Sequence, residues 1–115
     1  MFTNQEVRRR SPRVNLRAGM RYQVRGSASE SSRTICDNIS AGGLAFSCNT
    51  YIAPQTPLML EIDVLSRILH PIGRVAWCEP LAHSDRNRMG VEFLEIDPLE
   101  KRYLTDFIEM RRVRF

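Results

Sequence analysis

Hydrophobic and polar residues alternate in short runs between about residue 21 and residue 94, as expected of strands with one buried face. The clearest run spans residues 57–64, where Leu58, Leu60, Ile62 and Val64 share one face. Turn-forming glycine, serine and proline residues separate this run from its neighbours. The other runs that predict strands are residues 21–25, 35–40, 44–48, 68–77 and 90–94.

The run at residues 35–40 also predicts which side chains share a face. Strict alternation puts Ile35 and Ile39 on one side, with Ile39 in the core, and puts Cys36, Asn38 and Ser40 on the other. Asn38 and Ser40 are therefore expected together on one surface of a strand.

The pattern changes to a helical one at Asp97. Asp97 is a good N-cap, Pro98 suits the first helical position, and Glu100 is placed to complete a capping box. The helix is expected from about residue 98 to 110, docked on the sheet, and the arginines at 111, 112 and 114 suit its C-terminus. Its predicted apolar stripe consists of Leu99, Tyr103, Leu104, Phe107 and Ile108.

About six short strands followed by one helix predict a mainly β fold. Short antiparallel strands at this spacing favour a small closed or nearly closed barrel with a C-terminal α-helix. A chain of 115 residues suits one domain. We expect residues 1–17, which are polar, basic and interrupted by Pro12, to form a flexible arm, and residues 18–115 to form the barrel domain.

The charge distribution points to an anionic partner. The net charge is +4, and of the 17 basic residues only Lys101 is a lysine. Seven arginines but only one acidic residue, Glu6, lie within residues 1–25. Arginine is favoured where a planar fork grips a phosphate or a guanine edge, so a nucleotide, a nucleic acid or a membrane surface is expected. A solvated basic tail is the alternative.

Signatures of enzymes and metal sites are missing from the sequence. No GxSxG, HExxH, P-loop or GxGxxG motif is present, so we expect no catalytic activity. The three cysteines form no CxxC pair, and His70 and His83 are isolated, so no metal or cofactor is expected. With no secretion signal and no apolar run long enough for a membrane helix, we expect a cytoplasmic protein without membrane insertion.

Two segments remain as candidate binding elements. The first is Arg8-Arg9-Arg10-Ser11-Pro12-Arg13, which contains an R-x-x-x-R spacing from Arg9 to Arg13. The second is Asn38-Ile39-Ser40-Ala41-Gly42-Gly43, in which short polar side chains precede glycines whose backbone N–H groups can approach a ligand. Taken singly, they read as a basic arm and as a hairpin turn with polar strand ends.

Together the two segments resemble the signature of the PilZ family, R-x-x-x-R followed about 25 residues later by [D/N]-x-S-x-x-G. The match consists of Arg9, Arg13, Asn38, Ser40 and Gly43, with the Gly90-Val91-Glu92-Phe93 segment and the helix also in place. The resemblance implies a six-stranded antiparallel barrel with a terminal helix. It also implies binding of the bacterial second messenger cyclic di-GMP, and a change of shape that signals to a downstream protein.

The resemblance also assigns roles to residues. It implies that Arg9 and Arg13 clasp guanine edges and phosphates, and that Asn38, Ser40 and Gly43 line the guanine pocket. An arginine at the position of Arg8 is associated in the family with a stacked pair of ligand molecules. Asparagine replaces the frequent aspartate at residue 38, which removes a charge from the pocket.

Three further residues are candidates at this site. Arg10 is a plausible supporting phosphate ligand, and the backbone of Gly42 is positioned like that of Gly43. Trp77, the only tryptophan, is in phase with Val75, which favours core packing; a position beside the bound base is the alternative.

Two other functions compete with the nucleotide receptor. One is a protein–protein adaptor with the same barrel and no ligand, as in pilus-assembly members of the family. The other is a basic barrel that binds RNA or DNA, which we do not expect because the strands lack a set of exposed aromatic residues for base stacking. The sequence does not indicate whether motility, adhesion or biofilm polysaccharide synthesis is the regulated process.

Overall fold

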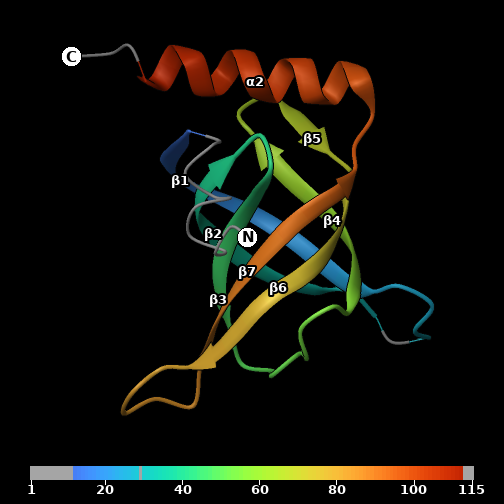
Figure 1. Cartoon of the computed structure of the whole chain (residues 1–115), viewed down its shortest axis with the longest axis vertical. Helices are drawn as coiled ribbons and strands as arrows, with labels where there is room; N and C mark the ends of the chain where they lie inside the picture. Colours follow the sequence, from blue (N-terminus) through green and yellow to red (C-terminus); the bar gives the residue numbers. More distant parts are fainter. Residues whose placement is uncertain (1–11, 29, 113–115) are drawn as a thin grey trace, which may run out of the picture.

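The computed structural model of the chain describes residues 12–28 and 30–112 (Figure 1). It contains seven strands and one helix in these residues. The strands are β1 (Arg13–Val24), β2 (Ser32–Ser40), β3 (Gly43–Cys48), β4 (Pro57–Val64), β5 (Arg67–Leu69), β6 (Ile72–Pro80) and β7 (Asn87–Glu95), and the helix is α2 (Pro98–Arg112).

The strands form a closed antiparallel barrel. Neighbouring strands follow the order β1, β2, β3, β7, β6 and β4, and the pairing of β4 with β1 closes the ring. The short strand β5 pairs with the end of β4 outside this six-stranded ring. The predicted six-stranded barrel with a C-terminal helix is therefore confirmed.

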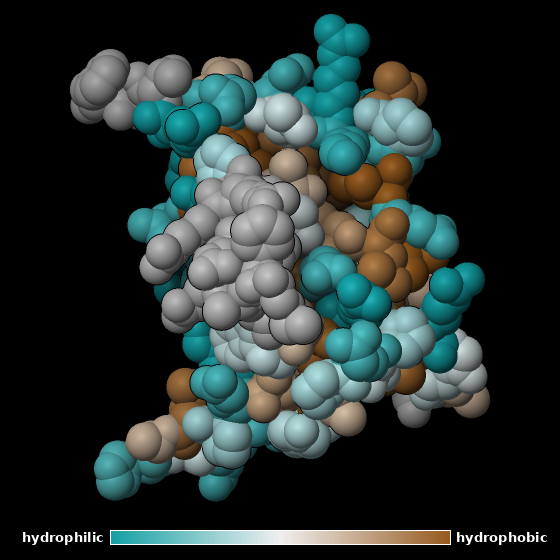
Figure 2. All heavy atoms as spheres, in the orientation of Figure 1, coloured by the Kyte–Doolittle hydropathy of each residue, from teal (hydrophilic) through white to brown (hydrophobic). Residues whose placement is uncertain are grey.

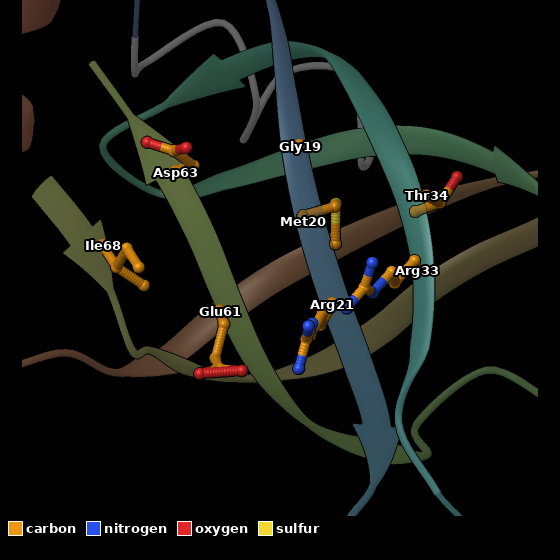
Figure 3. Close-up of a pocket in the computed structure, with 8 residues that line it drawn as sticks. All are labelled: Gly19, Met20, Arg21, Arg33, Thr34, Glu61, Asp63 and Ile68. Atoms are coloured by element: carbon orange, nitrogen blue, oxygen red, sulfur yellow. The ribbon is translucent and has the colours of Figure 1, made fainter. Parts of the chain in front are cut away.

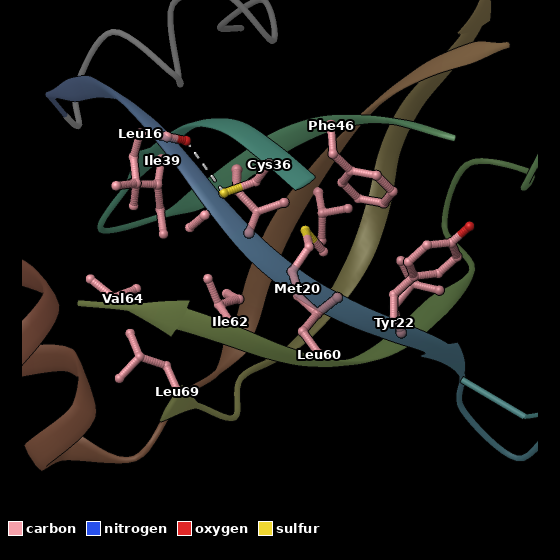
Figure 4. Close-up of a cluster of buried hydrophobic side chains, with 14 of the residues drawn as sticks. Leu16, Met20, Tyr22, Cys36, Ile39, Phe46, Leu60, Ile62, Val64 and Leu69 are labelled. Atoms are coloured by element: carbon pink, nitrogen blue, oxygen red, sulfur yellow. Dashed lines mark hydrogen bonds between the residues drawn. The ribbon is translucent and has the colours of Figure 1, made fainter. Parts of the chain in front are cut away.

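The barrel interior is filled by apolar side chains from every strand of the ring (Figure 4). Strand β4 alternates as predicted, with Leu58, Leu60, Ile62 and Val64 buried and the intervening residues exposed. Each such burial stabilises the fold by about 1.5–3 kcal/mol. Because each strand of the ring buries one face in the core, the side chains on its other face lie on the outside of the barrel, where they are available for binding.

Helix α2 lies across one end of the barrel (Figure 1). Asp97 caps it as predicted, because its Oδ2 accepts hydrogen bonds from the backbone N–H groups of Leu99 (3.0 Å) and Glu100 (3.2 Å). Leu104, Phe107 and Ile108 bury the helix against the core. Hydrophobic surface is visible between helix and barrel in Figure 2.

Two predictions for the helix were wrong. Leu99 does not belong to the buried stripe, since it is 69% exposed. Glu100 forms no capping box; its carboxylate instead accepts a hydrogen bond from the backbone N–H of His70 (2.8 Å) and lies 3.1 Å from Nδ1 of the same residue. Glu100 therefore ties the helix to the chain between β5 and β6.

The far end of the helix is tied to strand β1. Arg111 donates a hydrogen bond from Nη2 to the backbone oxygen of Asn15 (2.8 Å), and Tyr103 donates its hydroxyl proton to the backbone oxygen of Val64 (2.8 Å). The helix is thus linked to the barrel at both ends and near its middle.

The boundary between arm and barrel also differs from the prediction. Strand β1 begins at Arg13, so residues 13–17, which we assigned to the arm, belong to this strand, and Arg13, Val14 and Asn15 pair with β2. The polar, arginine-rich composition concealed this strand, because only its inward residues, such as Leu16, are apolar. The rest of the predicted arm, residues 1–11, lies outside the described residues.

Two of the register shifts in the barrel overturn the strict alternation. A register shift between Cys36 and Asn38 inserts Asp37, so Cys36 is buried with Ile39 while Ile35 is 50% exposed. A second shift lies between Val75 and Trp77, so Trp77 does not share the face of Val75 as predicted. Bulges cannot be read from period-2 patterns, and both of these lie beside the predicted site.

Candidate functional site

The predicted site residues lie on the outer face of the barrel, where strand pairing arranges them in two rows. Directly paired residues in antiparallel strands point to the same side of a sheet. The first row crosses strands β1, β2, β3, β7 and β6 and consists of Asn15, Asn38, Ala45, Gly90 and Trp77.

The second row runs parallel to the first, displaced toward the β2–β3 turn. Pairing brings together Arg13, Ser40, Gly43, Glu92 and Arg74. Both rows belong to one surface, because their members on each strand are two residues apart or, on β6, separated by the bulge. The structure therefore places Arg13, the last arginine of the first motif, on one surface with the second motif.

The middle of the first row consists of two small residues, Ala45 and Gly90, and the indole ring of Trp77 covers Gly90. A Cβ atom on Gly90 would lie 2.3 Å from Nε1 of Trp77, so the ring lies directly over this glycine. Trp77 is accordingly only part-buried on the outer face, which corrects its expected place in phase with Val75. The flat indole, next to a residue as small as Ala45, is suited to stacking with a planar base.

Asn38 and Arg13 are in direct contact. Nη1 of Arg13 donates a hydrogen bond to Oδ1 of Asn38 (2.6 Å). The Asn38 amide in turn donates from Nδ2 to Oδ1 of Asp37 (3.1 Å). These contacts fix the amide orientation and hold the guanidinium of Arg13 at the edge of the two rows.

Asp37 is held by Arg88 from strand β7. Arg88 makes a two-pronged ion pair with both carboxylate oxygens, including a hydrogen bond of 2.8 Å from Nη2 to Oδ1. Hydrogen bonding from Arg88 lowers the pKa of the Asp37 carboxyl below its usual value, and the pair raises the pKa of Arg88. Arg88 therefore holds Asp37 in place, and Asp37 in turn orients the amide of Asn38.

Ser40, Gly42 and Gly43 build the tight turn between β2 and β3. The Ser40 hydroxyl is buried; it accepts a hydrogen bond from the backbone N–H of Gly42 (3.1 Å) and donates to the backbone oxygen of Gly43 (3.4 Å). A Cβ on Gly43 would lie 2.1 Å from the backbone oxygen of Val91. Close approach of the β3 and β7 backbones thus requires glycine at residue 43.

Sequence reasoning missed an ion pair in the second row. Arg74 donates from Nη2 to Oε1 of Glu92 (2.8 Å), and both side chains are about two-fifths exposed. Strict alternation would put Arg74 on the face opposite to Trp77, but the bulge after Val75 puts both on the outer face. No pattern of residue types marks that bulge in the sequence.

The structure brings together six of the nine predicted ligand-binding residues. Arg13, Asn38, Ser40, Gly42, Gly43 and Trp77 all belong to the two rows or to the turn beside them. Arg8, Arg9 and Arg10 lie outside the described residues. Over residues 12–28 and 30–112, no cluster of three or more histidine, cysteine or acidic side chains could hold a metal ion.

A separate hollow of about 470 Å³ lies further along strand β1 (Figure 3). Arg21 and Arg33 lie side by side at one wall, and Glu61 and Asp63 come from β4 at the other. Of the motif residues that the structure describes, Arg13 and residues 38–43, none lines it. The two rows and the β2–β3 turn beside them are together called the motif surface below. This surface and the hollow are therefore distinct features of the same barrel.

The motif surface combines three chemical properties. It offers a guanidinium at one edge, amide and backbone groups in the middle, and an indole with an ion pair at the other edge. Guanidinium groups bind phosphates and the O6 and N7 edge of guanine, and the indole offers a stacking face. A compact anionic ligand with purine bases fits this set of groups.

Comparison with known proteins gives a consistent result. The model of the PilZ domain family matches residues 7–110. No curated protein matches the chain by sequence. In the described residues, no helix is long and apolar enough to cross a membrane.

Solved structures share the fold at low sequence identity. The chain is similar to the inhibitor of motility from Bacillus subtilis (TM-score 0.81, 22% identity, 98% of this chain and 57% of that one). It also resembles the cyclic di-GMP complex of YcgR from Escherichia coli (0.73, 16%, 90% and 45%) and that of MrkH from K. pneumonia (0.65, 18%, 93% and 56%). The chain thus spans about half the length of these three proteins.

Proposed function

The chain belongs to the PilZ domain family, and from this premise we propose that it is a receptor for cyclic di-GMP. The observation that carries the proposal is the contact between Arg13 and Asn38, which joins the last arginine of R-x-x-x-R to the first residue of N-x-S-x-x-G. The cyclic di-GMP complexes of YcgR and MrkH, which share the fold, support the choice of ligand.

In this proposal the ligand lies over the two outer rows. Arg9 and Arg13 clasp phosphates and a guanine edge, and Arg10 adds a phosphate contact. Asn38 binds the base, while the turn formed by Ser40, Gly42 and Gly43 shapes the pocket floor. Trp77 stacks beside a guanine, which its position over Gly90 supports.

The arginine at residue 8 favours uptake of a stacked pair of ligand molecules. Two cyclic di-GMP molecules carry four phosphates, and the three consecutive arginines 8–10 supply three of the positive charges that would balance them. We therefore propose a stoichiometry of two.

We further propose that the protein is a signalling receptor in the cytoplasm with no enzymatic activity of its own. Ligand contacts change the conformation at the start of β1, and the altered surface binds a downstream protein. An adaptor that acts by protein contact alone is the second candidate, favoured by the similarity to an inhibitor of motility.

Calorimetric titration of cyclic di-GMP tests the receptor proposal. We expect micromolar or tighter binding to the wild type, loss of binding in Arg9→Ala/Arg13→Ala, and a stoichiometry that reports one molecule or two. Arg102→Ala, on the exposed surface of α2, is the matched control and should bind normally. A folded wild type that gives no binding heat would refute the receptor and favour the adaptor.

A further inference from the structure

The ion pair between Arg74 and Glu92 lies in the same row as the motif residues. Glu92 is the direct partner of Gly43 across strands β3 and β7, and Gly43 is the partner of Ser40. Adjacent strands are about 4.8 Å apart, so Glu92 lies two strands, roughly 10 Å, from Ser40. Within this row of paired strand residues, the residue between them is Gly43, which has no side chain.

Guanine differs from other bases at the edge that carries N1–H and the 2-amino group. Both are donors and point the same way, so a carboxylate can accept from both at once. Adenine presents an acceptor at N1 and cannot make this pair of bonds. A carboxylate within the binding surface would therefore discriminate in favour of guanine.

Neither Asn38 nor Asp37 is well suited to accept both of these hydrogen bonds, although Asn38 can contact the base in another way. The Oδ1 atom of Asn38 already accepts from Arg13, and its amide donates to Asp37. Both oxygens of Asp37 are engaged by Arg88. The acceptor atoms of Asn38 and Asp37 are thus already engaged by arginine side chains of the protein.

Glu92 retains capacity to accept further hydrogen bonds. Its Oε1 accepts one bond from Arg74, and a carboxylate offers about four acceptor positions. Its side chain is 43% exposed, so a ligand can reach it. Arg74 fixes one oxygen, which limits the rotamers that the carboxylate can adopt before the base arrives.

We propose that Glu92, oriented by Arg74, is the residue that selects guanine by accepting hydrogen bonds from N1–H and the 2-amino group. The proposal rests on the function proposed above and names the source of its base specificity. Glu92 is the ligand-contacting residue, and Arg74 is a positioning residue.

Cyclic di-IMP, which lacks the 2-amino group but keeps the rest of cyclic di-GMP, isolates this contact. We would titrate both nucleotides into the wild type and into Glu92→Gln. The four affinities then form a thermodynamic cycle with one change in the protein and one in the ligand. We expect the wild type to bind cyclic di-GMP about tenfold more tightly than cyclic di-IMP. In Glu92→Gln this preference should fall below about threefold, with weaker binding of cyclic di-GMP.

Glu95→Gln is the matched control, since it removes an exposed carboxylate from the same strand. It should keep the wild-type preference. Arg74→Met removes the side chain that orients Glu92 but leaves Glu92 in place. It should lower the preference for cyclic di-GMP, which a surface residue with no role in positioning Glu92 would not do.

The possible failures are distinguishable. An unchanged preference in a folded Glu92→Gln variant that binds cyclic di-GMP overturns the inference and leaves the receptor function intact. Absence of any binding to the wild type refutes the receptor function itself, and the inference with it.

Discussion

Arg13 and Asn38 are separated by 25 positions in the sequence, yet the guanidinium of Arg13 donates a hydrogen bond of 2.6 Å to the side-chain oxygen of Asn38. One residue starts strand β1 and the other lies beside a bulge in β2. The contact shows that Arg13, the last residue of the first motif, shares a surface with the second motif.

Removal of the Asn38 amide should weaken cyclic di-GMP binding. Asn38→Ala deletes a group that orients Arg13 and, in our proposal, contacts the base, so we expect affinity to fall about tenfold or more. Calorimetry measures this loss. Asn49→Ala, which removes a partner of Arg86 beyond the end of β3, should bind like the wild type. Equal affinity in both variants would contradict a role of Asn38 in binding.

Gly43→Ala should destabilise the barrel. Its methyl group would lie 2.1 Å from the backbone oxygen of Val91, which forces β3 and β7 apart at a cost of about 1–3 kcal/mol. Gly19→Ala is the matched control on β1, because its Cβ would meet no atom within 4 Å. Urea unfolding compares the two. A Gly43→Ala variant as stable as Gly19→Ala would contradict the close strand approach.

Trp77 should report ligand binding by its fluorescence. It is the only tryptophan, its ring lies on the outer face over Gly90, and a guanine stacked on it would quench its emission. We expect saturable quenching on addition of cyclic di-GMP and affinity several-fold lower in Trp77→Ala. Unchanged emission under conditions where calorimetry detects binding would place the base elsewhere.

The ion pair of Asp37 and Arg88 should make stability depend on acid pH. The pKa of Asp37 is lowered in the folded protein, chiefly by the hydrogen bonds from Arg88. Its contribution is therefore complete above the ordinary carboxyl pKa of 3.8 and is lost as pH falls through the lower, folded value. Between pH 5 and about pH 2.5 the wild type should lose more unfolding free energy than Asp37→Asn. Parallel losses would show that the pair contributes nothing.

Cys36 should give a pH dependence of the opposite sense. Burial raises the pKa of its thiol from 9.0 to about 11, so the folded state disfavours the thiolate. Its stabilising contribution is complete below about pH 9 and is lost as pH rises through about 11. Alkylation at pH 8 should modify the part-buried Cys78 well before Cys36. Faster labelling of Cys36 would contradict its burial.

Much of this architecture could be predicted from the sequence, because simple periods govern it. Strand β4 alternates without interruption, and Asp97-Pro98 marks the helix start by local chemistry alone. The N-x-S-x-x-G turn was also identifiable, since glycine at residue 43 answers a steric need.

The remaining features depend on tertiary contacts that no local pattern encodes. The bulge at Asp37 is stabilised by Arg88, 51 residues away, and it reverses the faces of Ile35 and Cys36. The bulge after Val75 brings Arg74 and Trp77 to one face, so that the Arg74–Glu92 ion pair lies on the same surface as Trp77. Strand β1 was truncated in our prediction because its outward residues are polar and arginine-rich.

The central claim is that cyclic di-GMP binds on the outer face between Arg13 and Trp77. A nuclear magnetic resonance titration that follows backbone amides and the single indole N–H tests it most directly. We predict shifts at Asn38, Gly43, Gly90 and the Trp77 indole, with residues of the hollow in Figure 3, such as Arg33 and Asp63, unaffected. Shifts confined to that hollow, or none at saturating ligand, would contradict the account.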